Sequence, residues 1–156
     1  MLSNSIIEHS WSVNNSAFRC VKQSVEAMLV LANGLKFYGS NSQTVEKTVC
    51  PRVALNISSY EPCITMCKQS FHGETNAISN ANKTNQDLKD SVMYLTGHWV
   101  CCDNCRKVMK QNGVKYAILL NSSDRVINFV DFRNDETLGI MDHDYTTAMK
   151  NYKEMI

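Results

Sequence analysis

Three short and strongly apolar segments limit the folds that this chain can adopt. They are residues 27–31, 92–96 and 114–120. Continuous apolar character over so few residues is typical of strands that are covered on both faces. Segments with helical character lie between them, and strands that alternate with helices indicate a layered α/β fold.

Local signals place further elements around these segments. Asn33 and Gly34 separate the first apolar segment from residues 35–38, which strongly favours a hairpin. Gly113 is expected to end a helix. We also expect the end of an opening helix at 16–23, helices at 72–82, 102–111 and 146–156, and a fifth strand at 126–132. No internal repeat or Pro/Ser-rich linker interrupts the chain, so a single domain over 1–156 is expected.

Charge and hydropathy narrow the possible partners. The formal net charge is only +1, whereas a dedicated nucleic-acid binder usually has a marked basic excess. No segment approaches the roughly 18 apolar residues that span a bilayer, and the first residues lack the basic and apolar regions of a signal peptide. We therefore expect a cytoplasmic protein that binds no membrane, and the near-neutral charge argues against nucleic acid as its partner, although a local basic groove stays open.

Two segments carry residues suited to metal chemistry. The chain has seven cysteines, and in a reducing compartment clustered cysteines are more often metal ligands or catalytic groups than disulfides. His72, Cys102 and Cys105 supply three ligands suited to zinc and leave a fourth position for water. Glu74 would reach that water without ligating the metal, and zinc lowers the pKa of such a water to about 7.

Each segment alone is a weak signal, and the combination is far more specific. A lone C-x-x-C is also found in redox pairs and in halves of structural zinc sites, and H-x-E is common. Here each segment begins a predicted helix, and a predicted strand at 92–96 leads into the cysteine pair. The pair of motifs is the one that zinc-dependent base deaminases use.

The chain resembles the zinc-dependent cytidine and deoxycytidylate deaminases, most closely the deoxycytidylate branch. The sequence HGETNAI from His72 is similar to that branch's His-Ala-Glu-x-Asn-Ala-Ile, and Tyr94-Leu95-Thr96 followed by Cys102 to Cys105 resembles its Tyr-Val-Thr and Pro-Cys-x-x-Cys. The resemblance covers about residues 20–120. Departures include Gly73 in place of Ala, Cys101 in place of Pro, and Glu26 where Gly is usual.

This resemblance implies a three-layer α/β/α fold with a mixed sheet of about five strands. It also implies hydrolysis of dCMP to dUMP and ammonia, which supplies dUMP for thymidylate synthesis. His72, Cys102 and Cys105 would hold one catalytic zinc, and Glu74 would carry protons to the ring and the departing amine. A homo-oligomer, in the family's case a hexamer, and regulation by dCTP and dTTP are further implications.

Four residues near these motifs have open roles. By resemblance, Asn41 would hydrogen-bond the deoxyribose, although Asn also commonly shapes turns. Backbone groups at Thr96 and Gly97 would read the pyrimidine edge. His98 either lines the mouth of the active site or is an ordinary loop histidine.

A second, structural zinc is a further hypothesis for the loop before His72. Its ligands would be Cys50, Cys63 and Cys67, with a fourth from Cys20, His9 or His98; the alternative is that these thiols bind nothing.

Two other functions are open. The same chemistry would serve a nucleoside, a modified dCMP or a base in single-stranded nucleic acid. A non-enzymatic zinc module would use the cysteines to staple loops, but it gives no reason for Glu74 beside a ligand histidine.

Overall fold

The structure, a computed structural model, describes residues 2–13, 18–19, 25–43, 56, 69–71, 73–97, 103–132, 136–137 and 143–144. Its helices are α1 (Leu2–Val13), α4 (Gly73–Asn82) and α5 (Asp103–Gln111). Its longer strands are β2 (Glu26–Val30), β3 (Lys36–Ser40), β6 (Ser91–Thr96), β7 (Val114–Leu120) and β8 (Arg125–Asp131). Shorter strands are β1 (Phe18–Arg19), β4 (Ser42–Gln43), β5 (Gln69–Phe71), β9 (Glu136–Thr137) and β10 (His143–Asp144).

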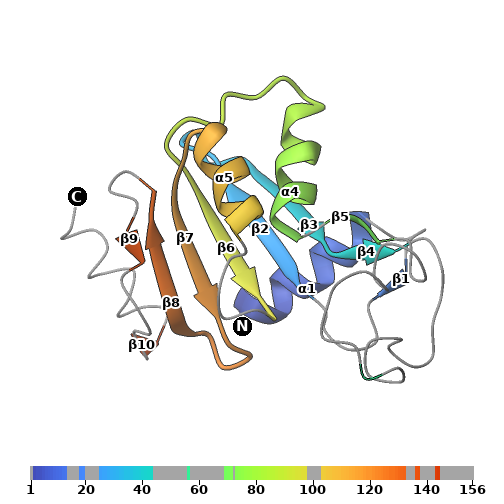
Figure 1. The fold of residues 1–156 in the computed structure, drawn as a ribbon. Coiled ribbons are helices and arrows are strands. Elements are labelled where there is room, and N and C mark those ends of the chain that lie inside the picture. Colours follow the sequence, from blue (N-terminus) through green and yellow to red (C-terminus); the bar gives the residue numbers. More distant parts are fainter. Residues whose placement is uncertain are drawn as a thin grey trace.

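One mixed sheet forms the centre of the molecule (Figure 1). Its strand order is β10-β8-β7-β6-β2-β3, and β9 also pairs with β8. Among the described pairs, β6 and β7 run parallel and the others are antiparallel. The prediction of a mixed sheet of about five strands is therefore confirmed, with two two-residue strands added beyond β8. A small separate sheet has the order β1-β4-β5.

Alternating side chains of the central strands build one core on each face of the sheet. Leu29 on β2 and Met93 on β6 belong to the core beneath α4 and α5, whereas their neighbours Met28 and Tyr94 belong to the core beneath α1. Both faces are thus apolar, as continuous apolar segments predict. Such a sheet is stable in water only when both faces are covered.

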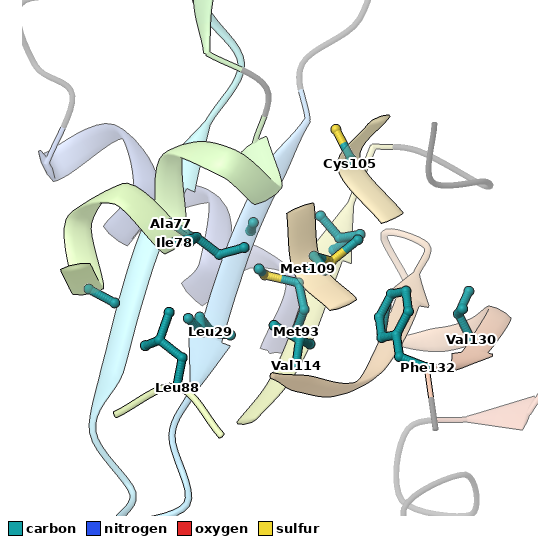
Figure 2. Packing of buried hydrophobic residues seen from close by; sticks show 14 of the residues in the cluster. Leu29, Ala77, Ile78, Leu88, Met93, Cys105, Met109, Val114, Val130 and Phe132 are labelled. Atoms are coloured by element: carbon teal, nitrogen blue, oxygen red, sulfur yellow. The ribbon is translucent and has the colours of Figure 1, made fainter. Parts of the chain in front are cut away.

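The helices supply those covers and complete three layers. Ile6 of α1 is fully buried against one face, while Ala77 and Ile78 of α4 and Met109 of α5 pack on the other. Figure 2 shows this second core, with α4 and α5 beside each other over the strands. The predicted α/β/α arrangement is confirmed. None of the helices in the described part of the chain has the length and apolar character that crossing a bilayer demands.

Most local predictions agree with the structure. The β2–β3 hairpin turns at Asn33 and Gly34, and α4, β6, α5, β7 and β8 lie within two residues of their predicted ranges. Gly113 has a φ of +83° at the end of α5, which suits a glycine C-cap. The opening helix was placed too late, because α1 ends at Val13 and residues 18–19 form β1. The predicted helix at 146–156 lies outside the described residues.

A turn far along the chain caps the first helix. Asp124, in the β7–β8 turn, accepts hydrogen bonds from the backbone N–H groups of Leu2 at 2.7 Å and Ser3 at 2.8 Å. Burial alone raises the pKa of Asp124, but the hydrogen bonds from Ser3 and Leu2 outweigh it and hold the pKa below its ordinary value of 3.8. The charged carboxylate therefore stabilises the docked helix.

We predict that Asp124→Asn lowers the free energy of unfolding by about 1 kcal/mol at pH 7, because the amide offers one acceptor oxygen to two N–H groups. The folded pKa is depressed, so the contribution of the carboxylate is present above the unfolded pKa and is lost as the pH falls through the folded pKa. The difference between variant and wild type should shrink below about pH 4. Urea unfolding at pH 7, 5 and 3 measures this.

Asp90→Asn is the matched control. Asp90 also has a left-handed backbone, with φ of 62° against 59° for Asp124, and its side chain is exposed. It should change stability by less than about 0.5 kcal/mol. Equal losses in both variants would show that the cap contributes nothing specific.

Candidate active site

One end of the sheet gathers most of the predicted site residues that the structure describes. Glu26, the first residue of β2, pairs with Ser40 at the end of β3 and with Thr96 at the end of β6. We call the end marked by these three residues the site end. α4 begins there, because a β-carbon on Gly73 would lie 3.0 Å from the carbonyl oxygen of Val25, the residue before Glu26.

Glu74 lies in the first turn of α4 and is almost completely buried, with 2% of its surface exposed. Its Oε1 atom is buried and has no hydrogen-bond partner among the described residues. Leaving a buried carboxylate oxygen without a partner is costly, so such a group usually serves a function or an absent ligand. The helix N-terminus partly compensates, because its dipole favours a negative charge.

Cys105 lies in the first turn of α5, and its side chain is fully buried (Figure 2). It belongs to the same core as Ala77 and Ile78 of α4, so the two helices pack against each other near this thiol. A helix N-terminus lowers the pKa of a thiol and favours the thiolate, which is the form that binds metal. The burial of Cys105 at the start of α5 therefore suits one thiolate ligand of a zinc ion.

The other two predicted ligands lie outside the described residues. In the sequence, His72 immediately precedes α4 and Cys102 immediately precedes α5. Among the residues that the structure describes, no group of three His, Cys, Asp or Glu side chains forms a metal site. His72 and Cys102 are not among those residues, so the ligand set stays a prediction.

Thr96 and Glu26 form a buried pair at the site end. The Thr96 hydroxyl donates a hydrogen bond of 3.2 Å to Oε2 of Glu26, and both residues are at most 3% exposed. Glu26 thus stabilises the end of β6, the strand that precedes Cys102 in the sequence. The backbone of Thr96 and Gly97 stays the predicted reader of the pyrimidine.

Asn41 is buried and ties the end of β3 to the start of β2. Its Oδ1 atom accepts a hydrogen bond of 2.8 Å from the Val25 N–H, and its own N–H donates to the Val25 carbonyl at 3.0 Å. The side-chain oxygen therefore shapes the chain here, as Asn often does in turns.

The remaining predicted residues are not brought together by the described structure. His98, Cys20, Cys50, Cys63 and Cys67 lie outside the described residues. His9 is exposed on α1, where its Nδ1 atom lies 2.7 Å from the Ser5 carbonyl and its ring stacks on Tyr38 with 4.9 Å between centroids. The second zinc site stays a hypothesis.

Comparison with known proteins identifies the family. The profile of the cytidine and deoxycytidylate deaminase zinc-binding region matches residues 3–121. A cytidine deaminase from Burkholderia pseudomallei has a similar fold, with a TM-score of 0.56, 19% identity and coverage of 86% of this chain and 95% of that chain. The dCMP deaminase of cyanophage S-TIM5 gives a TM-score of 0.47 and 21% identity over 77% of this chain and 82% of that chain. No curated protein sequence matched significantly.

The matched region covers most of the chain, so the protein belongs to the cytidine and deoxycytidylate deaminase family. Membership implies a zinc-binding hydrolase that acts on cytosine compounds. The resemblance seen in the sequence is thereby confirmed at the level of the family.

Sequence reasoning missed how closely β3 approaches α4. A β-carbon on Gly39 would overlap the backbone nitrogen of Ala77 and lie 2.7 Å from the carbonyl oxygen of Gly73. The helix backbone therefore rests directly on the strand at Gly73 and Ala77, on both sides of the catalytic candidate Glu74. A single Gly in a strand often marks such an approach, and this was the available signal.

We predict that Gly39→Ala destabilises the protein by about 1–3 kcal/mol, because the added methyl group meets backbone atoms that cannot rotate away. Thermal unfolding measures the loss. Lys36→Ala, on an exposed position of the same strand, should change stability by less than about 0.5 kcal/mol. Wild-type stability in Gly39→Ala would show that α4 does not rest on β3 as described.

Proposed function

We propose that this protein removes the 4-amino group of dCMP by hydrolysis and releases dUMP and ammonia. The observation that carries the proposal is the buried Glu74 carboxylate, whose Oε1 atom lacks a partner among the described residues, in a chain of the zinc-binding deaminase family. The choice of dCMP rests on the sequence around His72 and Tyr94 to Cys105, which resembles the deoxycytidylate branch.

In this proposal His72, Cys102 and Cys105 hold the zinc. The bound metal would lower the pKa of a water molecule to about 7 and so provide a nucleophile at neutral pH. Glu74 would accept the first proton of the attacking water and deliver it to N3 of the cytosine ring. It would then take the second proton from the new hydroxyl group on C4 and deliver it to the departing amine. The oxygen of water becomes bonded to C4, the C4–N bond breaks, and ammonia leaves.

The burial of Glu74 suits this work. A carboxylate with one oxygen unpartnered is able to accept a proton without first breaking a hydrogen bond within the described protein. Its burial keeps bulk water from competing for that proton. A staple-like zinc module would gain nothing from this arrangement and would bear the cost of desolvating the carboxylate.

The resemblance extends the proposal to binding and regulation. The backbone of Thr96 and Gly97 would read the pyrimidine, and Asn41 and His98 would contact substrate. A homo-oligomer, in the form of a hexamer, activation by dCTP, inhibition by dTTP and a cytoplasmic location are parts of the same proposal. A second zinc at Cys50, Cys63 and Cys67 would be structural.

We predict that Glu74→Gln lowers kcat by at least about 10²-fold, because the amide cannot accept and return a proton. Zinc content and thermal stability should stay close to wild type, since Glu74 is not a proposed ligand. Ammonia release from dCMP, deoxycytidine, cytidine, dCTP and an oligonucleotide is the measurement, and it also identifies the substrate.

Glu8→Gln is the matched control, because Glu8 is exposed on α1. It should deaminate at the wild-type rate. Near-normal activity in Glu74→Gln would remove the proton-transfer role, and loss of zinc in that variant would support the structural zinc module instead.

We also predict that Cys105→Ala loses zinc together with activity, because it removes a thiolate ligand. Elemental analysis of the purified variant should show at least about tenfold less zinc than wild type. Met109→Leu, a volume-conserving change one turn further along the buried side of α5, should keep its zinc. Full zinc occupancy in Cys105→Ala would contradict the assigned ligand set.

A further inference from the structure

Two side chains of α4 bind the backbone of β3. Asn76 Oδ1 accepts a hydrogen bond of 2.9 Å from the Ser40 N–H, and Asn80 Nδ2 donates one of 2.7 Å to the Tyr38 carbonyl. β3 is the last strand on its side of the described sheet. In an antiparallel ladder every second residue directs its backbone groups away from the partner strand, and Tyr38 and Ser40 are two residues apart. The asparagines therefore satisfy the outer edge of β3.

The spacing of the two asparagines matches the spacing of the two backbone groups. Four residues of an α-helix advance about 6 Å, and two residues of a strand advance about 6.8 Å. Asn76 and Asn80 thus meet Ser40 and Tyr38 in register. One bond uses the side chain as acceptor and the other uses it as donor, so a helix displaced along or rotated about its axis would lose both.

Gly39 lies between the two bonded residues and lets the helix approach. A β-carbon there would overlap the Ala77 nitrogen and lie 2.8 Å from the carbonyl carbon of Asn76. We call Gly39, Asn76, Asn80 and the backbone of Tyr38 and Ser40 the α4 seam. At its other end, Asn41 holds the Val25 backbone against which Gly73 packs.

Glu74 lies inside the stretch that these contacts fix. Gly73 is seated on Val25, and Asn76 is bonded to Ser40. Because no described residue hydrogen-bonds Oε1 of Glu74, the location of this oxygen depends on where the helix holds its backbone.

We propose that the α4 seam sets the axial position and rotation of α4 and so places the Glu74 carboxylate for proton transfer. Asn76 and Asn80 are then positioning residues for the reaction. This inference rests on the proposed function. A misplacement of about 1 Å at a reacting group costs up to about 10²-fold in rate, so a displaced helix should be visible in kcat.

The two asparagines offer an informative set of variants. Asn80→Asp keeps the shape of the side chain and removes the N–H that reaches Tyr38, while an oxygen stays available to the Lys83 ammonium, which now lies 3.4 Å from Oδ1. Asn82→Asp adds the same charge at an exposed position of the same helix. Asn76→Ala removes the acceptor for the Ser40 N–H, and Asn76→Asp restores an acceptor oxygen.

The experiment measures kcat, KM and zinc content for these four variants with the substrate that wild type deaminates. Hydrogen exchange of the Ser40 amide provides a readout that does not depend on activity. We expect kcat to fall at least about tenfold in Asn76→Ala and Asn80→Asp, with KM within about threefold and zinc retained. Ser40 should exchange faster in Asn76→Ala. Asn76→Asp should recover most of kcat, and Asn82→Asp should match wild type.

If Asn76→Ala has an unchanged kcat and faster exchange of the Ser40 amide, the inference is overturned. The bond between Asn76 and Ser40 would then be lost while Glu74 still transferred protons at the wild-type rate. An equal loss in Asn80→Asp and Asn82→Asp would overturn it as well, since charge alone would explain both. If Asn76→Ala does not fold, the comparison of Asn80→Asp with Asn82→Asp tests the inference, because Asn80 is partly exposed and its substitution disturbs the core less. If the wild-type protein deaminates no cytosine compound, the proposed function and this inference both fail. If the wild-type protein is active and the variants have the same kcat, only the inference fails.

Discussion

The rest of the structure depends on the burial of both faces of the central strands. β2, β6 and β7 direct apolar side chains to each side of the sheet, and neither side can face water without a large cost. This requirement brings α1 to one face and α4 and α5 to the other. α4 and α5 share one face and contact each other, so the helices that carry Glu74 and Cys105 cover the same core. The need to cover this face therefore determines which side of the sheet carries Glu74 and Cys105.

Burial has opposite consequences for the two acidic residues of the site end. Glu26 is matched by the Thr96 hydroxyl, so its carboxylate contributes to holding two strand ends together. Glu74 has an oxygen without a partner in the described structure, and its energetic cost is sustained by the helix N-terminus and by the contacts that fix α4. One carboxylate is thus part of the scaffold, whereas the other keeps an oxygen that no described residue hydrogen-bonds.

Much of this was visible in the sequence, and the reasons are local. Apolar segments of five to seven residues mark β2, β6 and β7, the Asn33-Gly34 pair marks the hairpin, and Gly113 marks the end of α5. His72, Glu74, Cys102 and Cys105 were predicted as a zinc site because zinc chemistry needs those residue types at that spacing, and this assignment stays a prediction. The contacts of Asn76 and Asn80 with β3 were not predictable, because they join residues 36 and 42 positions apart through side chains that have no distinctive pattern. The early start of α1 was missed for a similar reason, since its cap comes from Asp124.

That cap has a consequence for the order in which the protein folds. The cap of α1 is a carboxylate that lies 122 residues beyond Leu2 and 121 residues beyond Ser3 along the chain. Before β7 and β8 have paired and formed their turn, α1 lacks both its cap and the complete sheet against which it packs. Contacts of such long sequence separation form late and slow the folding of a domain. We therefore expect α1 to be among the last elements to reach its native position, after the β7–β8 turn has formed.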